Sequence, residues 1–265
     1  MLRYSAPVRV PEVTVAFWLA KGLSTALGES TSDYLVHAFN PYLAVGAGFV
    51  VFVVAMVLQL SHGRYSPVRY WFAVGMVGIF GTMVADVAHV ALGVPYGVSS
   101  VIFALALVGG FVAWAKVEGS LSIHDVTTLR RELFYWFAVI STFAMGTAIG
   151  DLTAITFRLG YLGSLVLFAL LILVPGAAYR WIGLSGVPAF WSSYVLTRPL
   201  GASFADWTGK PIGVGGLGWG DGTMALVLAI LFVAVVGLTA RTRERPGRFR
   251  SGSGWQGLHQ TSWRG

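Results

Sequence analysis

The sequence has no cysteine and few charged residues for its length. The 265-residue chain has no cysteine, which excludes disulfides and thiolate metal sites. Only 11% of its residues are charged, whereas an ordinary soluble domain has about 25%. Because 56% of the residues are hydrophobic and the mean hydropathy is +0.73, the composition indicates an integral membrane protein.

Several other patterns are missing as well. The apolar runs are continuous rather than alternating and approach the ~20 residues of a spanning helix, which excludes a transmembrane barrel. Glu12 and Lys21 interrupt any early apolar run, so no cleavable signal peptide is expected. No nucleotide-binding or Ser-His-Asp signature is present, so we expect neither nucleotide use nor enzymatic activity.

One signature is present four times: a Trp, nine residues, a Gly, four residues and an Asp, without gaps. Its copies are Trp18, Gly28 and Asp33; Trp71, Gly81 and Asp86; Trp136, Gly146 and Asp151; and Trp191, Gly201 and Asp206. Copies two and three also share Tyr-Trp-Phe-Ala-Val, and copies one and four share Ala-Phe-Trp. Such self-similarity at a near-constant period indicates tandem repeats.

The predicted fold class is an all-α integral membrane protein with eight transmembrane helices from four two-helix repeats. We expect the helices near residues 11–37, 41–60, 70–91, 95–115, 133–157, 161–181, 187–207 and 223–240. They form a single transmembrane domain, residues 1–240, with repeats near 10–60, 67–116, 132–181 and 187–240. Residues 241–265, rich in Arg, Ser and Gly, are expected to be a basic, disordered cytoplasmic tail.

Lysine and arginine lie mainly on one side of the predicted membrane, in the loops that precede odd helices and in the tail. The opposite loops have only Arg158 and Lys210. The positive-inside rule therefore predicts that both termini are cytoplasmic and that the repeats are parallel copies, not inverted ones. We interpret the net charge of +7 as this topology signal, and we expect lipid but no nucleic acid as a partner.

These motifs resemble an uncharacterised bacterial membrane-protein family built from four tandem repeats, each with two transmembrane segments and a Trp. The resemblance covers residues 10–241. It implies the eight-span architecture and a location in the bacterial inner membrane, and it implies no established activity. The function must therefore be inferred from individual residues.

A carboxylate within a membrane is costly and marks a functional site by default. Fifteen residues place each Asp ~22 Å along its helix from the signature Trp, near the helix C-terminus, whose partial negative charge attracts cations. The four Asp residues are thus expected to converge on one cation site. The alternatives are pairing with Lys21, Arg198, Arg158 or Lys210, or exposure at the outer surface.

Neighbouring side chains suggest metal ligation. Glu29 and His37 lie four residues before and after Asp33, and His89 lies three after Asp86, so each shares a helix face with its Asp. Carboxylates with imidazoles suit a divalent transition ion. The predicted metal ligands are therefore Asp33, Asp86, Asp151, Asp206, Glu29, His37 and His89.

Other residues receive supporting roles. Lys21 and Arg198 lie inside predicted helices and are expected to balance charge, pairing with Asp33 and Asp206 when no ion is bound. Trp18, Trp71, Trp136 and Trp191 are expected to anchor the membrane interface, with packing as the alternative. Gly28, Gly81, Gly146 and Gly201 are expected to let helices approach closely.

The favoured function is transport of a divalent metal cation, with Mn as the preferred ion and as the substrate rather than a resident cofactor. The first alternative is a proton-coupled transporter of a small organic solute or cation. The second is a structural or haem-binding redox protein. Haem is not expected, because only His37 and His89 lie in predicted spans and both are near the outer end. An oligomer is compatible with the sequence.

Overall fold

The computed structural model describes residues 7–243. The predicted disordered tail, residues 241–265, lies outside the described residues except for 241–243, which end the last helix. Between residues 7 and 243 every regular element is helical. The all-α fold class is therefore confirmed for this part of the chain.

The long helices fall where the sequence predicts them, with ends that differ by a few residues. They are α1 (Val15–Ala38), α2 (Pro41–Leu60), α3 (Pro67–Asp86), α4 (Tyr96–Glu118), α5 (Leu129–Asp151), α6 (Gly160–Leu171), α7 (Leu173–Trp181), α8 (Gly186–Gly209) and α9 (Asp221–Arg243). The span predicted at 161–181 is divided into α6 and α7. Short 3-10 turns, η2 (Ile123–Asp125) and η4 (Ile212–Val214), lie in the connections.

Local sequence explains several helix starts. Asn40 precedes α2, and its side-chain oxygen accepts hydrogen bonds from the backbone N–H groups of Tyr42 and Leu43, while Pro41 occupies the first turn. Thr14 and Thr128 cap α1 and α5 in the same way. Such caps satisfy N–H groups that have no partner inside the helix, so they fix the point at which each helix begins.

Within the described residues, six helical segments are long and apolar enough to cross a membrane. They are Pro41–Leu60, Pro67–Ala91, Tyr96–Glu118, Leu129–Thr156, Gly160–Trp181 and Asp221–Arg241. The outer helices also expose large apolar side chains, for example Val50, Val101, Leu170 and Val233. Exposed apolar surface of this extent indicates contact with lipid, so the chain is a multi-pass membrane protein.

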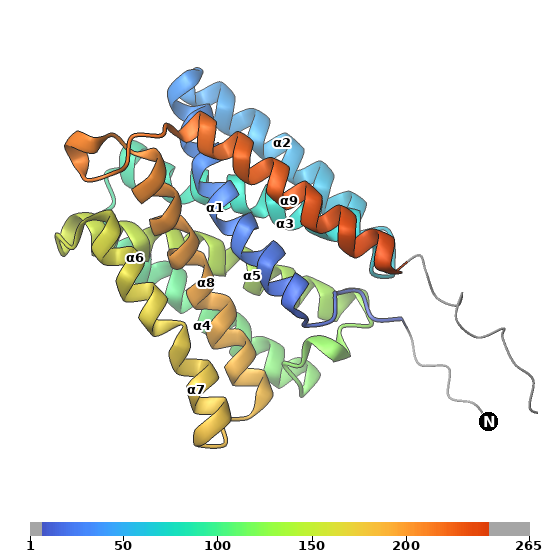
Figure 1. Ribbon diagram of the computed structural model, residues 1–265. Coiled ribbons are helices and arrows are strands. Elements are labelled where there is room, and N and C mark those ends of the chain that lie inside the picture. Colours follow the sequence, from blue (N-terminus) through green and yellow to red (C-terminus); the bar gives the residue numbers. More distant parts are fainter. Residues whose placement is uncertain (1–6, 244–265) are drawn as a thin grey trace, which may run out of the picture.

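The helices that carry the signature, α1, α3, α5 and α8, form a closed inner ring in which each packs against the next and α8 packs against α1. The remaining helices lie outside this ring (Figure 1). Each outer helix packs mainly on the inner helix of the following repeat: α2 on α3, α4 on α5, α6 on α8, and α9 back on α1. The repeats are therefore interlocked around a pseudo-fourfold axis rather than stacked as separate hairpins.

The signature glycines lie at the contacts between neighbouring inner helices. A Cβ atom at any of them would come within about 3 Å of the next helix, closer than side chains tolerate. The contacts follow the ring in order: Gly28 against Gly78, Gly81 against Phe143, Gly146 against Arg198, and Gly201 against Thr25. Each of the four signature glycines therefore lies where two inner helices approach closely.

The signature tryptophans do not face the lipid as interface anchors would. Trp71, Trp136 and Trp191 are only 2%, 1% and 5% exposed, and they belong to the aromatic core at one end of the bundle. The Trp136 and Trp191 ring N–H groups donate to Glu132 and to the Leu121 carbonyl. The prediction of interface anchoring is wrong for these three residues, because the interlocked outer helices cover them. Trp18 is partly exposed.

Candidate cation site

The signature aspartates lie near the ends of the inner helices opposite to the tryptophans. Asp86 and Asp151 are the last α-helical residues of α3 and α5, and a π-helical turn follows each, η1 (Val87–Ala91) and η3 (Leu152–Thr156). Helices α1 and α8 stay α-helical beyond Asp33 and Asp206. π-Helical turns are rare in proteins, and those that occur are often found at functional sites. The two equivalent turns therefore indicate that the functional site lies at this end of the bundle.

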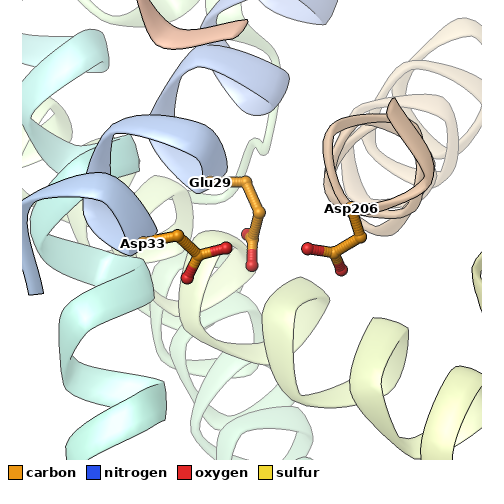
Figure 2. Close-up of side chains that lie close together, drawn as sticks. All are labelled: Glu29, Asp33 and Asp206. Atoms are coloured by element: carbon orange, nitrogen blue, oxygen red, sulfur yellow. The ribbon is translucent and has the colours of Figure 1, made fainter. Parts of the chain in front are cut away.

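Glu29, Asp33 and Asp206 form the closest group of carboxylates. One oxygen from each lies within 4.8 Å of the other two. Figure 2 shows Glu29 and Asp33 extending from α1 toward Asp206 on α8, with the Glu29 carboxylate between the others. Metal–oxygen distances of about 2.0–2.6 Å place opposite ligands of one ion about 4.0–5.2 Å apart. The three side chains therefore have the spacing needed to hold one divalent cation.

Asp86 and Asp151 complete a larger acid cluster, defined here as Glu29, Asp33, Asp86, Asp151 and Asp206. The charges of Asp86 and Asp151 interact with those of Glu29 and Asp33. Neither is part of the close group of three carboxylates. Of the four aspartates expected to converge, the structure brings Asp33 and Asp206 together with Glu29, and Asp86 and Asp151 lie near enough to interact electrostatically with Glu29 and Asp33.

The two histidines predicted as ligands do not join the close group. His37 is exposed near the end of α1, and its Nδ1 hydrogen-bonds the Asp33 carbonyl at 2.7 Å. His89 hydrogen-bonds the Val94 carbonyl at 2.8 Å, and its ring stacks on Tyr96. The structure therefore does not bring the predicted imidazole ligands into this group of carboxylates. Among the described residues, the close group consists of carboxylate oxygens alone.

Arg198 lies fully buried on the pseudo-fourfold axis, beside the acid cluster. Its Nη2 donates to Glu29 Oε2 at 2.6 Å, to Thr147 Oγ1 at 2.6 Å, and to Thr82 Oγ1. Glu29, Thr82 and Thr147 each follow their signature Trp by eleven residues. Side chains at equivalent positions of three repeats therefore bind the one guanidinium group of Arg198. The carboxylate that pairs with Arg198 is Glu29 rather than the predicted Asp206.

Lys21 is also fully buried, but it forms no ion pair with any carboxylate in residues 7–243. Within the described residues its Nζ has no hydrogen-bond partner, and it lies 3.9 Å and 4.1 Å from the ring centres of Phe143 and Tyr194. The predicted pairing of Lys21 with Asp33 is wrong, because twelve helical residues separate the two by ~18 Å along α1. Cation–π contacts replace the expected ion pair.

Lys210 is the basic residue that does bind the aspartates. It caps the C-terminus of α8, and its Nζ lies 2.5 Å from Asp33 Oδ2, 3.6 Å from Asp221 Oδ2 and 3.9 Å from Asp206 Oδ1. Burial alone would lower the pKa of Lys210, but these three carboxylates raise it above its ordinary value. Lys210 is one of the four basic residues that the sequence offers as partners of the aspartates, and its i,i+4 spacing from Asp206 is the signal that distinguishes it.

Comparison with known proteins identifies a family but no activity. No curated protein matches the chain, and no solved structure matches it. The family described as Repeat of Unknown Function (DUF347) matches residues 69–120, 134–183 and 189–245, which contain signature copies two, three and four. The chain belongs to this family of membrane-protein repeats of unknown function.

Proposed function

We propose that the protein transports a divalent metal cation and that the acid cluster is its coordinating core. The observation that supports this most is the approach of Glu29, Asp33 and Asp206 to within 4.8 Å inside a membrane bundle. Carboxylates within a membrane mark ion or proton pathways. Asp86 and Asp151 are electrostatically coupled to Glu29 and Asp33, so a bound doubly charged ion would favour the ionised form of these two carboxyl groups as well.

The ligand chemistry narrows the choice of ion. Because the close group contains Glu29, Asp33 and Asp206 but neither His37 nor His89, carboxylate oxygens are the ligands that it offers. Carboxylate and water ligands suit Mg, Ca and Mn, whereas Zn and Cu favour sites that include imidazole or thiolate. These ligands suit Mn, Mg and Ca alike, so we keep Mn as the proposed substrate and treat Mg and Ca as its direct competitors.

The proposed topology has eight spans, both termini in the cytoplasm, and the bacterial inner membrane as the location. Helices α1 and α8 have 24 residues each, or ~36 Å, which exceeds the hydrocarbon thickness of a bilayer. Lys21, Glu29, Asp33, Arg198 and Asp206 lower the hydropathy of these two helices, and all of them except Lys21 belong to the site or contact it. The orientation rests on the loop charges, and it places the acid cluster in the outer half of the membrane.

Lys21 favours a second candidate function, proton-coupled transport of a small organic solute or cation. A buried amino group without a hydrogen-bond partner is costly when charged, and it is a group that can gain and lose a proton during a transport cycle. In this case the aspartates act as proton carriers. Proton flux that depends on an organic solute, and not on a metal ion, would favour this candidate.

The test is transport of Mn²⁺ into proteoliposomes that contain a metal-quenched dye. We expect uptake with the wild-type protein and strong loss with Asp206→Asn, which removes one carboxylate charge from the close group. Glu118→Gln is the matched control, because Glu118 pairs with Arg130 and Arg131 rather than with the acid cluster. Equal uptake by wild type, Asp206→Asn and empty vesicles, for Mn²⁺, Mg²⁺ and Ca²⁺ alike, would contradict the proposal.

A further inference from the structure

We propose that Lys210 is a tethered competitor of the substrate ion. Its ammonium group and the ion bind the same aspartates in turn, so that the return of Lys210 helps to release the ion. This inference rests on the proposed function and adds the residue that couples ion binding to ion release. Lys210 is not one of the two residues, Lys21 and Arg198, that the sequence predicts to balance charge.

The first argument is that the two cations share ligands. Asp33 and Asp206 belong to the close group of carboxylates, and both also face Lys210 Nζ, at 2.5 Å and 3.9 Å. A metal ion on the same oxygens would lie within a few ångströms of the ammonium nitrogen. Because like charges at that distance repel strongly where water is scarce, the ion and the ammonium group exclude each other.

The second argument is that Lys210 has another partner to which it can move. Asp221, at the start of α9, lies 3.6 Å from Lys210 Nζ and is outside the close group. When the ion takes Asp33 and Asp206, the ammonium group can stay paired with Asp221. The displaced charge is then not left without a partner in a partly buried place, which would be costly.

The third argument is freedom of movement. Lys210 is the residue after the last helical residue of α8, its side chain is 18% exposed, and it has a flexible four-carbon stem. Arg198, the other cation beside the acid cluster, is fully buried and bound by side chains of several helices. A short displacement toward Asp221 therefore requires rotation of one side chain and no movement of a helix.

The experiment measures Mn²⁺ affinity by equilibrium dialysis of the purified full-length protein in detergent. Lys210→Met removes the competitor, so we expect its affinity for Mn²⁺ to rise by about fivefold or more, within the usual range of coupling between two ligands. Lys210→Arg keeps a competing charge and should not show this rise. Lys116→Met is the matched control, because it removes an exposed lysine in the last turn of α4.

A second variant predicts a change of the opposite sign. Asp221→Asn removes the alternative partner, which holds the ammonium group on Asp33 and Asp206 and weakens Mn²⁺ binding. In the Lys210→Met background, Asp221→Asn should have a much smaller effect, since no ammonium group is left to displace. Damage to folding would weaken binding in every variant, so the rise with Lys210→Met cannot arise from it.

The outcomes separate this inference from the proposed function. If the wild-type protein binds and transports Mn²⁺ but Lys210→Met binds it no more tightly, the competitor role is overturned and the transport proposal stands. If neither wild type nor Lys210→Met binds Mn²⁺, Mg²⁺ or Ca²⁺, the proposed function is overturned, and the competitor role falls with it.

Discussion

Two basic residues, Arg198 and Lys210, bind the acid cluster from opposite sides, and their surroundings differ. Arg198 is 0% exposed and donates to Glu29 and to the hydroxyl groups of Thr82 and Thr147. The Lys210 side chain is 18% exposed and faces Asp33, with Asp206 and Asp221 further away. We interpret the fully enclosed Arg198 as a structural cation that stabilises the fold, and the partly exposed Lys210 as the cation that a substrate ion can replace.

Arg198 and Lys210 also differ in their positions within the repeat. Arg198 follows its signature Trp by seven residues, and the equivalent positions in the other copies are Thr25, Gly78 and Phe143. A pseudo-fourfold axis has room for one such side chain, so a single repeat supplies the cation and the others supply its ligands. Lys210 directly follows α8, the inner helix of its repeat, and lies outside this symmetric interior.

The largest effect is expected from Arg198→Met. It leaves the Glu29 carboxylate buried without its cation, and breaking a buried ion pair in this way costs about 3–5 kcal/mol. The midpoint of thermal unfolding in detergent should fall sharply, and added Mn²⁺ should restore little of it because the axis has lost its packing as well. A fall no greater than that of the control Arg130→Met would contradict the structural role of Arg198.

The next effect tests the closed ring. In Gly28→Ala the new Cβ would lie 2.7–3.0 Å from the backbone of Gly78, which cannot move without shifting α3. Overpacking of this kind costs about 1–3 kcal/mol. Gly22→Ala is a matched control on the same helix, because no atom lies within 4 Å of its Cβ. Thermal unfolding should separate the two variants, and equal midpoints would contradict the contact between α1 and α3.

A smaller effect on stability is expected from Lys210→Met. The Lys210 side chain is 18% exposed and that of Arg198 is 0% exposed, so water reaches the carboxylates that Lys210→Met leaves behind more easily than it reaches Glu29. Because an ion can take the place of the ammonium group, Mn²⁺ should raise the unfolding midpoint of Lys210→Met more than that of wild type. If Arg198→Met gained as much from Mn²⁺ as Lys210→Met, the contrast between the two cations would be lost.

The smallest effect is expected from His37→Ala and His89→Ala. Loss of a metal ligand or its immediate partner typically costs about 10–100-fold in affinity. Since neither imidazole joins the close group of carboxylates, both variants should keep the Mn²⁺ affinity of wild type in equilibrium dialysis. A tenfold loss in either variant would return that histidine to the set of ligands.

Periodic features of the structure could be predicted from the sequence. Apolar runs gave the helices, and the fixed spacing of Trp, Gly and Asp gave the repeats and the close packing at Gly28 and its equivalents. The same spacing predicted that the aspartates gather at one end of the inner helices. These features depend on distances along a single helix, which ~1.5 Å per residue determines.

Features that depend on contacts between helices could not be predicted. No local pattern indicates that each outer helix packs on the following repeat, and this interlocking buries Trp71, Trp136 and Trp191. The partner of Arg198 likewise depends on which equivalent positions meet on the axis. For Lys21 the rise of the helix already excluded Asp33, so that prediction failed on a distance the sequence contained.

The most direct test of the central claim is to locate a bound ion. Anomalous diffraction from crystals of the protein grown with Mn²⁺ should show a single strong peak between Glu29, Asp33 and Asp206, with Lys210 Nζ displaced toward Asp221. No peak among these carboxylates under conditions where Mn²⁺ is bound elsewhere, or an ion held by His37 or His89 instead, would contradict the account.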